Sequence, residues 1–126
     1  LFAIQKVKES GNNNVIITER GSAFGYQDLV VDFRGIPKMK SFAPVVLDIT
    51  HSLQQPGALK KSTGGRGKYV FDLAKAGISQ AIAGLFIETH PNPDEAKCDG
   101  PCALHLHELP DFLKKIISLD DLIKTL

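Results

Sequence analysis

The sequence predicts an α/β fold with a parallel sheet, because apolar runs of strand length alternate with amphipathic helical segments. Three of these runs, at residues 15–18, 45–49 and 84–88, end in charged or polar side chains. Polar groups that follow the carboxyl ends of parallel strands are typical of α/β active sites, above all those of β/α barrels. We therefore expect a β/α barrel, of which this chain supplies about four β/α units.

The first half of the chain shows this alternation most simply. Its expected elements are a helix end at 3–10, a strand at 15–18, a loop at 21–26, a helix at 28–34 that restarts at Pro37, and a strand at 45–49. Gly11 provides the stop for the first helix. The β-branched run at 15–18 is typical of a parallel strand that is covered on both faces.

The second half continues the pattern. Its expected elements are a glycine-rich loop at 54–68, a helix at 69–82, a strand at 84–88, a weak strand at 103–107, and a helix from Pro110. The glycines predict a mobile loop beside the site, poorly ordered over residues 57–67 without substrate. The last helix is indicated by a clear apolar stripe with a period of 3.6 residues.

The length of 126 residues is ample for one domain. It is too short for a complete barrel, which takes about 250 residues. Half a barrel would leave two unpaired edge strands and an open inner face. The N-terminus has neither an initiator methionine nor the order of segments of a signal peptide. We therefore expect part of a longer polypeptide that supplies the missing half of the barrel, rather than a piece that pairs with a partner.

The composition is that of an ordinary globular chain, with 43% hydrophobic residues, 23% charged residues and a net charge of +1. Scattered basic residues predict no nucleic-acid partner. No apolar run approaches the roughly 18–20 residues that span a membrane. Cys98 and Cys102 are too few for a disulfide scaffold or a complete structural zinc site. We expect reduced thiols in a cytoplasmic enzyme.

Two sets of residues are candidates for chemistry from their types alone. His51, Glu88 and Asp99 suit a divalent transition metal with an exchangeable position. The alternative is that His51 is a hydrogen-bonded turn residue, that Glu88 pairs with a cation, and that Asp99 caps a turn. Arg20, directly after a buried strand, needs an anion, which a substrate phosphate, Glu19 or Asp48 would supply. The Gly-Gly-Arg segment at 64–66 is either a second anion site or an exposed loop.

Several long blocks closely resemble the 3-deoxy-D-manno-octulosonate-8-phosphate synthase family. They are GNNNVIITERGSAFGY (11–26), LVVD (29–32), PVVLDITHSLQQP (44–56), STGGR (62–66), AGLFIETHPNP (83–93) and AKCDGP (96–101). The blocks are collinear and cover nearly the whole chain. The resemblance implies tetrameric β/α barrels that condense phosphoenolpyruvate with arabinose 5-phosphate, a step of lipopolysaccharide biosynthesis. It implies a (β/α)8 TIM barrel of which this chain supplies roughly the last four β/α units, so that residues 1–126 would be the C-terminal half of a single TIM-barrel domain.

The resemblance also implies roles for individual residues. His51, Glu88 and Asp99 would be catalytic and, in metal-dependent members, would ligate the metal. The substrate-binding positions would be Arg20, Gln54, Ser62, Gly64, Gly65 and Arg66. Arg20 and His51 would contact the phosphate of phosphoenolpyruvate, and the segment at 62–66 would close over bound substrate.

Metal dependence stays open, because the first-strand residue that decides it, cysteine or asparagine, is not in this chain. The cofactor is therefore either none or a divalent transition metal such as Zn, Fe, Mn or Cd. His105 departs from the family pattern, which often has proline there. Two alternatives remain for function: the related condensation with erythrose 4-phosphate, and a non-catalytic half barrel that binds sugar phosphates.

Overall fold

The chain, a computed structural model described over residues 1–25, 27–56 and 64–126, is centred on a three-stranded parallel sheet. The strands are β1 (Ile17–Glu19), β4 (Val45–Asp48) and β7 (Gly84–Phe86), in the order β1-β4-β7. Ile17 pairs with Val45, and Leu47 pairs with both Glu19 and Leu85. All three strands therefore end at the same edge of the sheet, as the sequence predicts.

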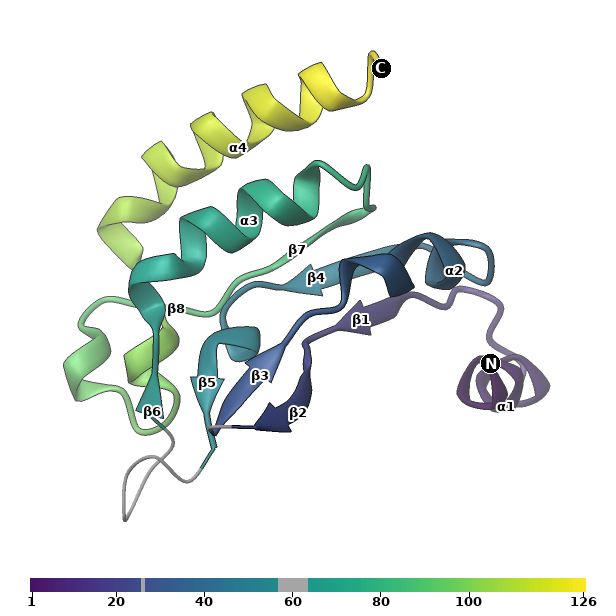
Figure 1. Cartoon of the computed structure of the whole chain (residues 1–126), viewed down its shortest axis with the longest axis horizontal. Helices are drawn as coiled ribbons and strands as arrows, with labels where there is room; N and C mark the ends of the chain where they lie inside the picture. Colours follow the sequence, from purple (N-terminus) through teal and green to yellow (C-terminus); the bar gives the residue numbers. More distant parts are fainter. Residues whose placement is uncertain (26, 57–63) are drawn as a thin grey trace.

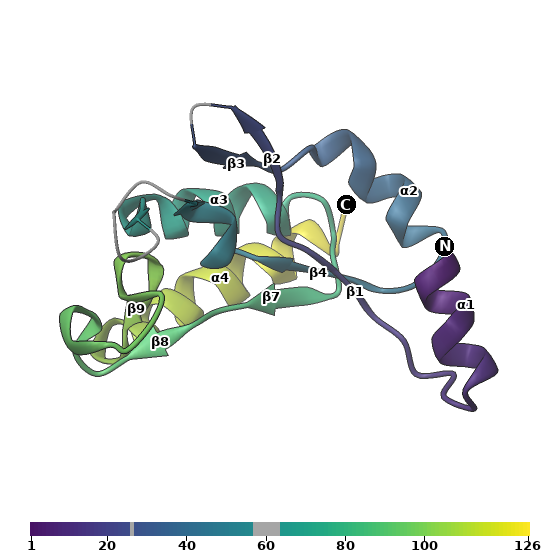
Figure 2. The ribbon, with the colours of Figure 1, turned by 90° about the horizontal axis from the view of Figure 1, so that it is seen from below.

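The helices of the described residues differ in how closely they approach this sheet. They are α1 (Phe2–Glu9), α2 (Ile36–Lys40), α3 (Val70–Ile78) and α4 (Leu109–Ile123). Helices α3 and α4 pack together on one side of the sheet (Figure 1). Helix α1 lies beyond the amino-terminal ends of the strands (Figures 1 and 2). The connecting loops lie at the carboxyl ends of the strands and carry the candidate site.

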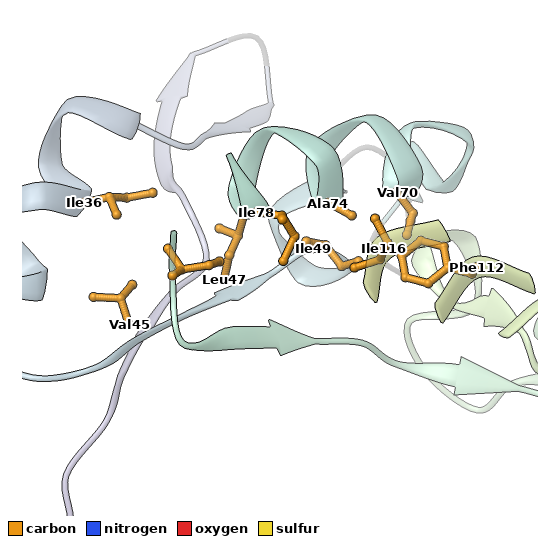
Figure 3. Close-up of a cluster of buried hydrophobic side chains, with 10 residues drawn as sticks. Ile36, Val45, Leu47, Ile49, Val70, Ala74, Ile78, Phe112 and Ile116 are labelled. Carbon is orange, nitrogen blue, oxygen red and sulfur yellow. The ribbon is translucent and has the colours of Figure 1, made fainter. Parts of the chain in front are cut away.

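The hydrophobic core lies between the sheet and helices α3 and α4 (Figure 3). Leu47 of the central strand is fully buried and shares this core with Ile78 and Ile116. Helix α3 approaches closely because Gly77 has no side chain, and a Cβ there would lie 2.6 Å from Leu47 Cδ2. This dense packing holds the strand ends in fixed positions.

The opposite face of the sheet is open. Ile16, directly before β1, is 61% exposed, and Phe86 in β7 is 47% exposed. The view from below shows this face of the three strands with no described helix over it (Figure 2). The prediction of strands covered on both faces therefore holds for one face only, within the part of the chain that the structure describes.

The helix predicted at residues 28–34 is wrong, and so is the loop predicted at 21–26. Strands β2 (Ser22–Gly25) and β3 (Asp28–Val30) form an antiparallel pair instead. Leucine and valine residues in this run suit a strand at least as well as a helix. Helical structure begins only after Asp32, whose carboxylate accepts a hydrogen bond from the Arg34 N–H at 3.1 Å. Helix α2 follows, with Pro37 in its first turn.

The fourth predicted strand, at 103–107, does not join the main sheet. Strand β9 (Leu104–His105) pairs in parallel with β8 (Thr89–His90), in a separate two-stranded sheet. A 3-10 turn, η6 (Leu106–Glu108), and then α4 follow at once, because Pro110 favours the first turn of a helix. The described residues thus give three strands in the main sheet, and the predicted count of four β/α units is not confirmed.

The glycine-rich segment is described at its two ends. Strands β5 (Gln54–Gln55) and β6 (Gly64–Gly65) pair antiparallel, and the 3-10 turn η3 (Gly67–Tyr69) leads into α3. Residues 57–63 lie outside the described residues, so poor order over this segment stays a prediction. Helix α3 ends at Ile78, earlier than expected. None of the described helices has the length and apolar character needed to cross a membrane.

Candidate active site

Three side chains meet at one point beyond the carboxyl ends of the strands. His51 Nε2 lies 3.0 Å from Glu88 Oε2 and 3.8 Å from Asp99 Oδ2. One ligand atom from each residue lies within 4.8 Å of the others, and all three side chains are partly buried. The structure thus brings together the three residues that the sequence predicts to converge. We call them the His-Glu-Asp cluster.

Asp48, the last residue of β4, organises the turn that carries His51. Its Oδ1 accepts hydrogen bonds from the backbone N–H of Thr50 at 3.1 Å and of His51 at 2.8 Å, and from the Thr50 hydroxyl at 3.0 Å. Its Oδ2 lies 2.8 Å from His51 Nδ1. A buried carboxylate needs such partners, because an unpaired charge in the interior costs free energy. The bonds fix both the backbone of the turn and the plane of the imidazole.

Thr50 connects the two strand ends that carry His51 and Glu88. Its hydroxyl oxygen accepts a hydrogen bond from the Glu88 N–H at 3.1 Å. The carbonyl of Glu88 in turn accepts a hydrogen bond from the Leu104 N–H at 2.9 Å. The aromatic ring of Phe86 packs near the imidazole, with ring centroids 5.7 Å apart. Backbone and side chain of Glu88 are therefore both held toward the cluster.

The cluster gathers negative charge around a single imidazole. Among the described residues, no lysine or arginine nitrogen lies within ion-pair distance of Glu88 or Asp99. A neutral imidazole protonated at Nδ1 would direct a lone pair from Nε2 at a carboxylate oxygen. That arrangement is favourable only with a positive charge between the two atoms, either a proton or a metal ion. Imidazole and carboxylate together are ligands that suit a divalent transition metal.

Arg20, the residue after β1, reaches the cluster through Gln54. Its guanidinium donates to Gln54 Oε1 at 2.8 Å, and Gln54 Nε2 donates to Asp99 Oδ1. Neither Glu19 nor Asp48, the two protein partners suggested by the sequence, bonds to this guanidinium. Gln54 is almost fully buried, whereas Arg20 is exposed. Among the described residues, no other group bonds to this guanidinium, so its remaining donors are available to an anion at the edge of the cluster.

The loop that carries Asp99 is tightly folded. Asp99 has a φ of +55°, in the left-handed region that aspartate tolerates better than most residues. Its carbonyl accepts hydrogen bonds from the N–H groups of Cys102 at 3.0 Å and Ala103 at 3.1 Å. Gly100 follows where an added Cβ would collide with the carbonyl oxygen of Pro93. These constraints set the direction of the Asp99 side chain.

Replacing Gly65 with alanine is expected to loosen this loop. A Cβ at Gly65 would collide with Cys102 Sγ and would lie 3.1 Å from the carbonyl carbon of Pro101. Overpacking of this kind lowers the free energy of unfolding by about 1–3 kcal/mol, measurable by urea denaturation. Adding Cys102→Ala should restore part of the loss. Gly25→Ala is the matched control, because nothing lies within 4 Å of its added Cβ. Equal stability of Gly65→Ala and Gly25→Ala would contradict the expectation.

The two free thiols should differ in reactivity. Cys98 is exposed and Cys102 is buried. Burial raises the pKa of the Cys102 thiol, so the folded protein keeps this proton at pH values where an unfolded chain has begun to lose it. At mildly alkaline pH, a thiol reagent should modify Cys98 first and Cys102 only when denaturant is added. Cys98→Ser should remove the early phase, and two equal phases in the native protein would contradict this.

The remaining predicted site residues make no hydrogen bond or ion pair to the cluster in the described structure, or lie outside the described residues. Arg66 bonds through its guanidinium to Asp28 Oδ2 at 3.0 Å, in the β2–β3 hairpin. Gly64 and Gly65 form β6. Ser62 lies outside the described residues. The structure therefore joins Arg20 and Gln54, but not Arg66, to the His-Glu-Asp cluster.

Sequence reasoning missed Asp48 and Thr50 as parts of the site. Both belong to the same strand end as His51, and both are at least 95% buried. A buried carboxylate three residues before a candidate histidine was the available signal, because such a group needs donors close by. The direction of its side chain, however, is visible only in the structure.

Comparison with known proteins shows which family the chain resembles. The family model described as the DAHP synthetase I family matches residues 1–125. The chain is 56% identical over 123 residues to a 2-dehydro-3-deoxyphosphooctonate aldolase of Pseudomonas savastanoi pv. phaseolicola, covering 97% of this chain and 44% of that protein. The relative of the same name from Pseudomonas syringae pv. tomato is 57% identical with the same coverage. A third, from Stutzerimonas stutzeri, is 57% identical over 122 residues, covering 96% of this chain and 43% of the relative. The chain thus spans less than half the length of these relatives.

Proposed function

Because the chain belongs to the DAHP synthetase I family, we propose that the intact protein condenses phosphoenolpyruvate with arabinose 5-phosphate and water. The products would be 3-deoxy-D-manno-octulosonate 8-phosphate and phosphate, for lipopolysaccharide biosynthesis. The names of relatives at 56–57% identity, which refer to a phosphooctonate, support the eight-carbon product. The observation that carries the proposal is the convergence of His51, Glu88 and Asp99, with Arg20 joined to them through Gln54.

We propose further that residues 1–126 are the C-terminal part of a single TIM-barrel domain. Two observations support this. The open face of the sheet bears Ile16 and Phe86, which the remaining strands of a barrel would cover. The chain also spans only 44% of its relatives. Family resemblance supports a cytoplasmic homotetramer. Light scattering would test the tetramer by measuring the molecular mass of the intact protein in solution.

Binding of phosphoenolpyruvate starts from the guanidinium of Arg20. Its donors that do not bond to Gln54 suit the phosphate, and the bond to Gln54 holds the guanidinium beside the cluster. His51 lies beyond Gln54 and Asp99, within reach of the same substrate. A substrate held in this way places its enol carbons next to the carboxylates, so that the reacting groups are already positioned for reaction.

The reaction then forms a carbon–carbon bond, adds water and expels phosphate. The electron pair of the C2–C3 double bond of phosphoenolpyruvate forms the new bond to the aldehyde carbon, and the aldehyde oxygen takes a proton. Water adds to C2 and gives up a proton, for which Glu88 and Asp99 are the nearest carboxylate acceptors of the cluster. The bond from C2 to the phosphate oxygen then breaks, the leaving phosphate takes the proton of the new C2 hydroxyl, and C2 becomes a carbonyl carbon.

The donor set of the cluster fits a divalent transition metal such as Zn, Fe, Mn or Cd. His51 would offer Nε2, and Glu88 and Asp99 would offer carboxylate oxygens. A metal held there would supply Lewis acidity toward a bound water or the aldehyde oxygen. In a metal-independent enzyme the same three residues would hold a proton and position the water. A residue of the missing first strand decides between these two classes.

A phosphate-release assay of the intact protein tests the proposed reaction. We expect faster turnover with arabinose 5-phosphate than with erythrose 4-phosphate, each in the presence of phosphoenolpyruvate. The description of the matching family favours erythrose 4-phosphate as the second candidate, so equal or preferred use of that aldehyde would overturn the choice. Binding of sugar phosphates without any turnover would instead support a non-catalytic half barrel.

A further inference from the structure

We infer that Asp48 is a positioning residue, which keeps a proton on His51 Nδ1 and so leaves Nε2 to share a proton or a metal ion with Glu88 and Asp99. The catalytic role of the cluster rests on the proposed function, whereas the position of the imidazole proton depends on the folded chain alone. Asp48 itself does not reach the substrate side of the cluster, because both of its oxygens are engaged by the turn. It acts through the imidazole alone.

The hydrogen-bond directions around Asp48 follow from counting protons. Two backbone N–H groups must donate to Oδ1, at 3.1 and 2.8 Å. The Thr50 hydroxyl oxygen accepts the Glu88 N–H, which leaves its one proton for Asp48 Oδ1. The ionised carboxylate has no proton to give, so the contact of 2.8 Å between its Oδ2 and His51 requires a proton on Nδ1.

The other side of the imidazole shows why this tautomer matters. Nε2 lies 3.0 Å from Glu88 Oε2 and 3.8 Å from Asp99 Oδ2. With Nδ1 protonated, Nε2 can share a proton or a metal ion with these two carboxylates. With the proton on Nε2 instead, that nitrogen could only donate to Glu88, and the cluster would lose one of its ligand atoms. Carboxylate, imidazole and metal arranged in this order are a common way to fix a ligating histidine.

The position of Asp48 suits this role. It ends the central strand of the sheet and is 5% exposed, and Thr50 is 1% exposed, so water does not compete for their hydrogen bonds. The strand is anchored on both sides by parallel neighbours. An orienting group on a rigid element holds its partner more accurately than one on a loop.

Nitrogen-15 NMR of the histidine side chains tests the inference directly in the intact protein without added metal. In the wild type, His51 Nδ1 should have the chemical shift of a protonated nitrogen near neutral pH. In Asp48→Asn, the amide oxygen can replace Oδ1 as the acceptor for the two backbone N–H groups. Its NH2 group then faces Nδ1 and donates to it, which moves the imidazole proton to Nε2.

Titration with Co²⁺ provides a second readout that does not depend on turnover. Asp48→Asn should weaken Co²⁺ binding by about 10–100-fold, the usual effect of losing a carboxylate behind a ligating histidine. Asp32→Asn is the matched control, because Asp32 also accepts a backbone N–H two residues ahead but lies on an exposed turn. It should leave both the His51 spectrum and Co²⁺ binding unchanged.

An unprotonated Nδ1 in the folded wild-type protein would overturn the inference. So would a folded Asp48→Asn protein with the wild-type tautomer and Co²⁺ affinity. If Asp48→Asn does not fold, or if the wild type binds no Co²⁺, the wild-type spectrum decides alone. An intact protein that releases no phosphate would refute the proposed reaction but would not affect the inference about the His51 proton. The two failures are therefore distinguishable.

Discussion

Replacing His51 with alanine is expected to lower kcat of the intact protein by at least about 100-fold, the usual scale for losing a proton-transfer group or its alignment. The imidazole is the one basic group among three carboxylates, with Asp48 on one side and Glu88 and Asp99 on the other. Its removal takes away the ligand atom or shared proton that keeps these carboxylates together. The loss should occur with or without a metal requirement, because both classes use the same nitrogen.

Steady-state phosphate release measures this effect, and His107→Ala is its control. His107 is exposed and makes no contact with the cluster in the described structure, so its removal should change kcat by less than threefold. Glu88→Ala then separates the two classes of enzyme. It should nearly abolish turnover where a metal is required and should have a much smaller effect where none is. A His51→Ala enzyme with kcat near that of the wild type would contradict the assigned role of the imidazole.

The meeting of His51 and Glu88 could be predicted from the sequence by simple topology. Each follows a buried apolar run, and consecutive parallel strands joined by a helix deliver their carboxyl ends to the same edge of a sheet. Strands β4 and β7 are in fact neighbours. Asp99 is different, because it comes from a long loop with several turns. Topology predicts that Asp99 reaches the same edge and the family resemblance names it as a ligand, but neither fixes where this loop carries its side chain.

The hairpin at residues 22–30 could not be predicted, for a physical reason. Its strands pair a short apolar run with a segment of small residues and glycine, and neither has a period that distinguishes strand from helix. Gly21, at a φ of +81°, allows close approach to the backbone of Val30, which becomes visible only in three dimensions. The same applies to Gln54, whose sequence position says nothing of the two groups that it joins.

Replacing Gln54 with leucine is expected to lower kcat/KM for phosphoenolpyruvate by about 10–100-fold. The buried amide donates to Asp99 and accepts from Arg20, and hydrogen bonds to charged groups contribute about 1.5–3 kcal/mol each. Leucine has a similar volume and neither polar atom, so both charged partners lose their orientation. Because Arg20 holds the phosphate in the proposed mechanism, a large part of the loss should fall on KM.

Gln55 provides a matched control on the neighbouring residue. Its amide donates to Asp28 at 3.0 Å, in the hairpin and away from the cluster, so Gln55→Leu should change kcat/KM by less than threefold. Gln54→Glu adds a second check, because its carboxylate would keep the bond to Arg20 but face Asp99 with a like charge. It should therefore retain more of the phosphoenolpyruvate affinity than Gln54→Leu and lose more in kcat. Equal effects of Gln54→Leu and Gln55→Leu would show that the amide bridge between Arg20 and Asp99 has no part in the reaction.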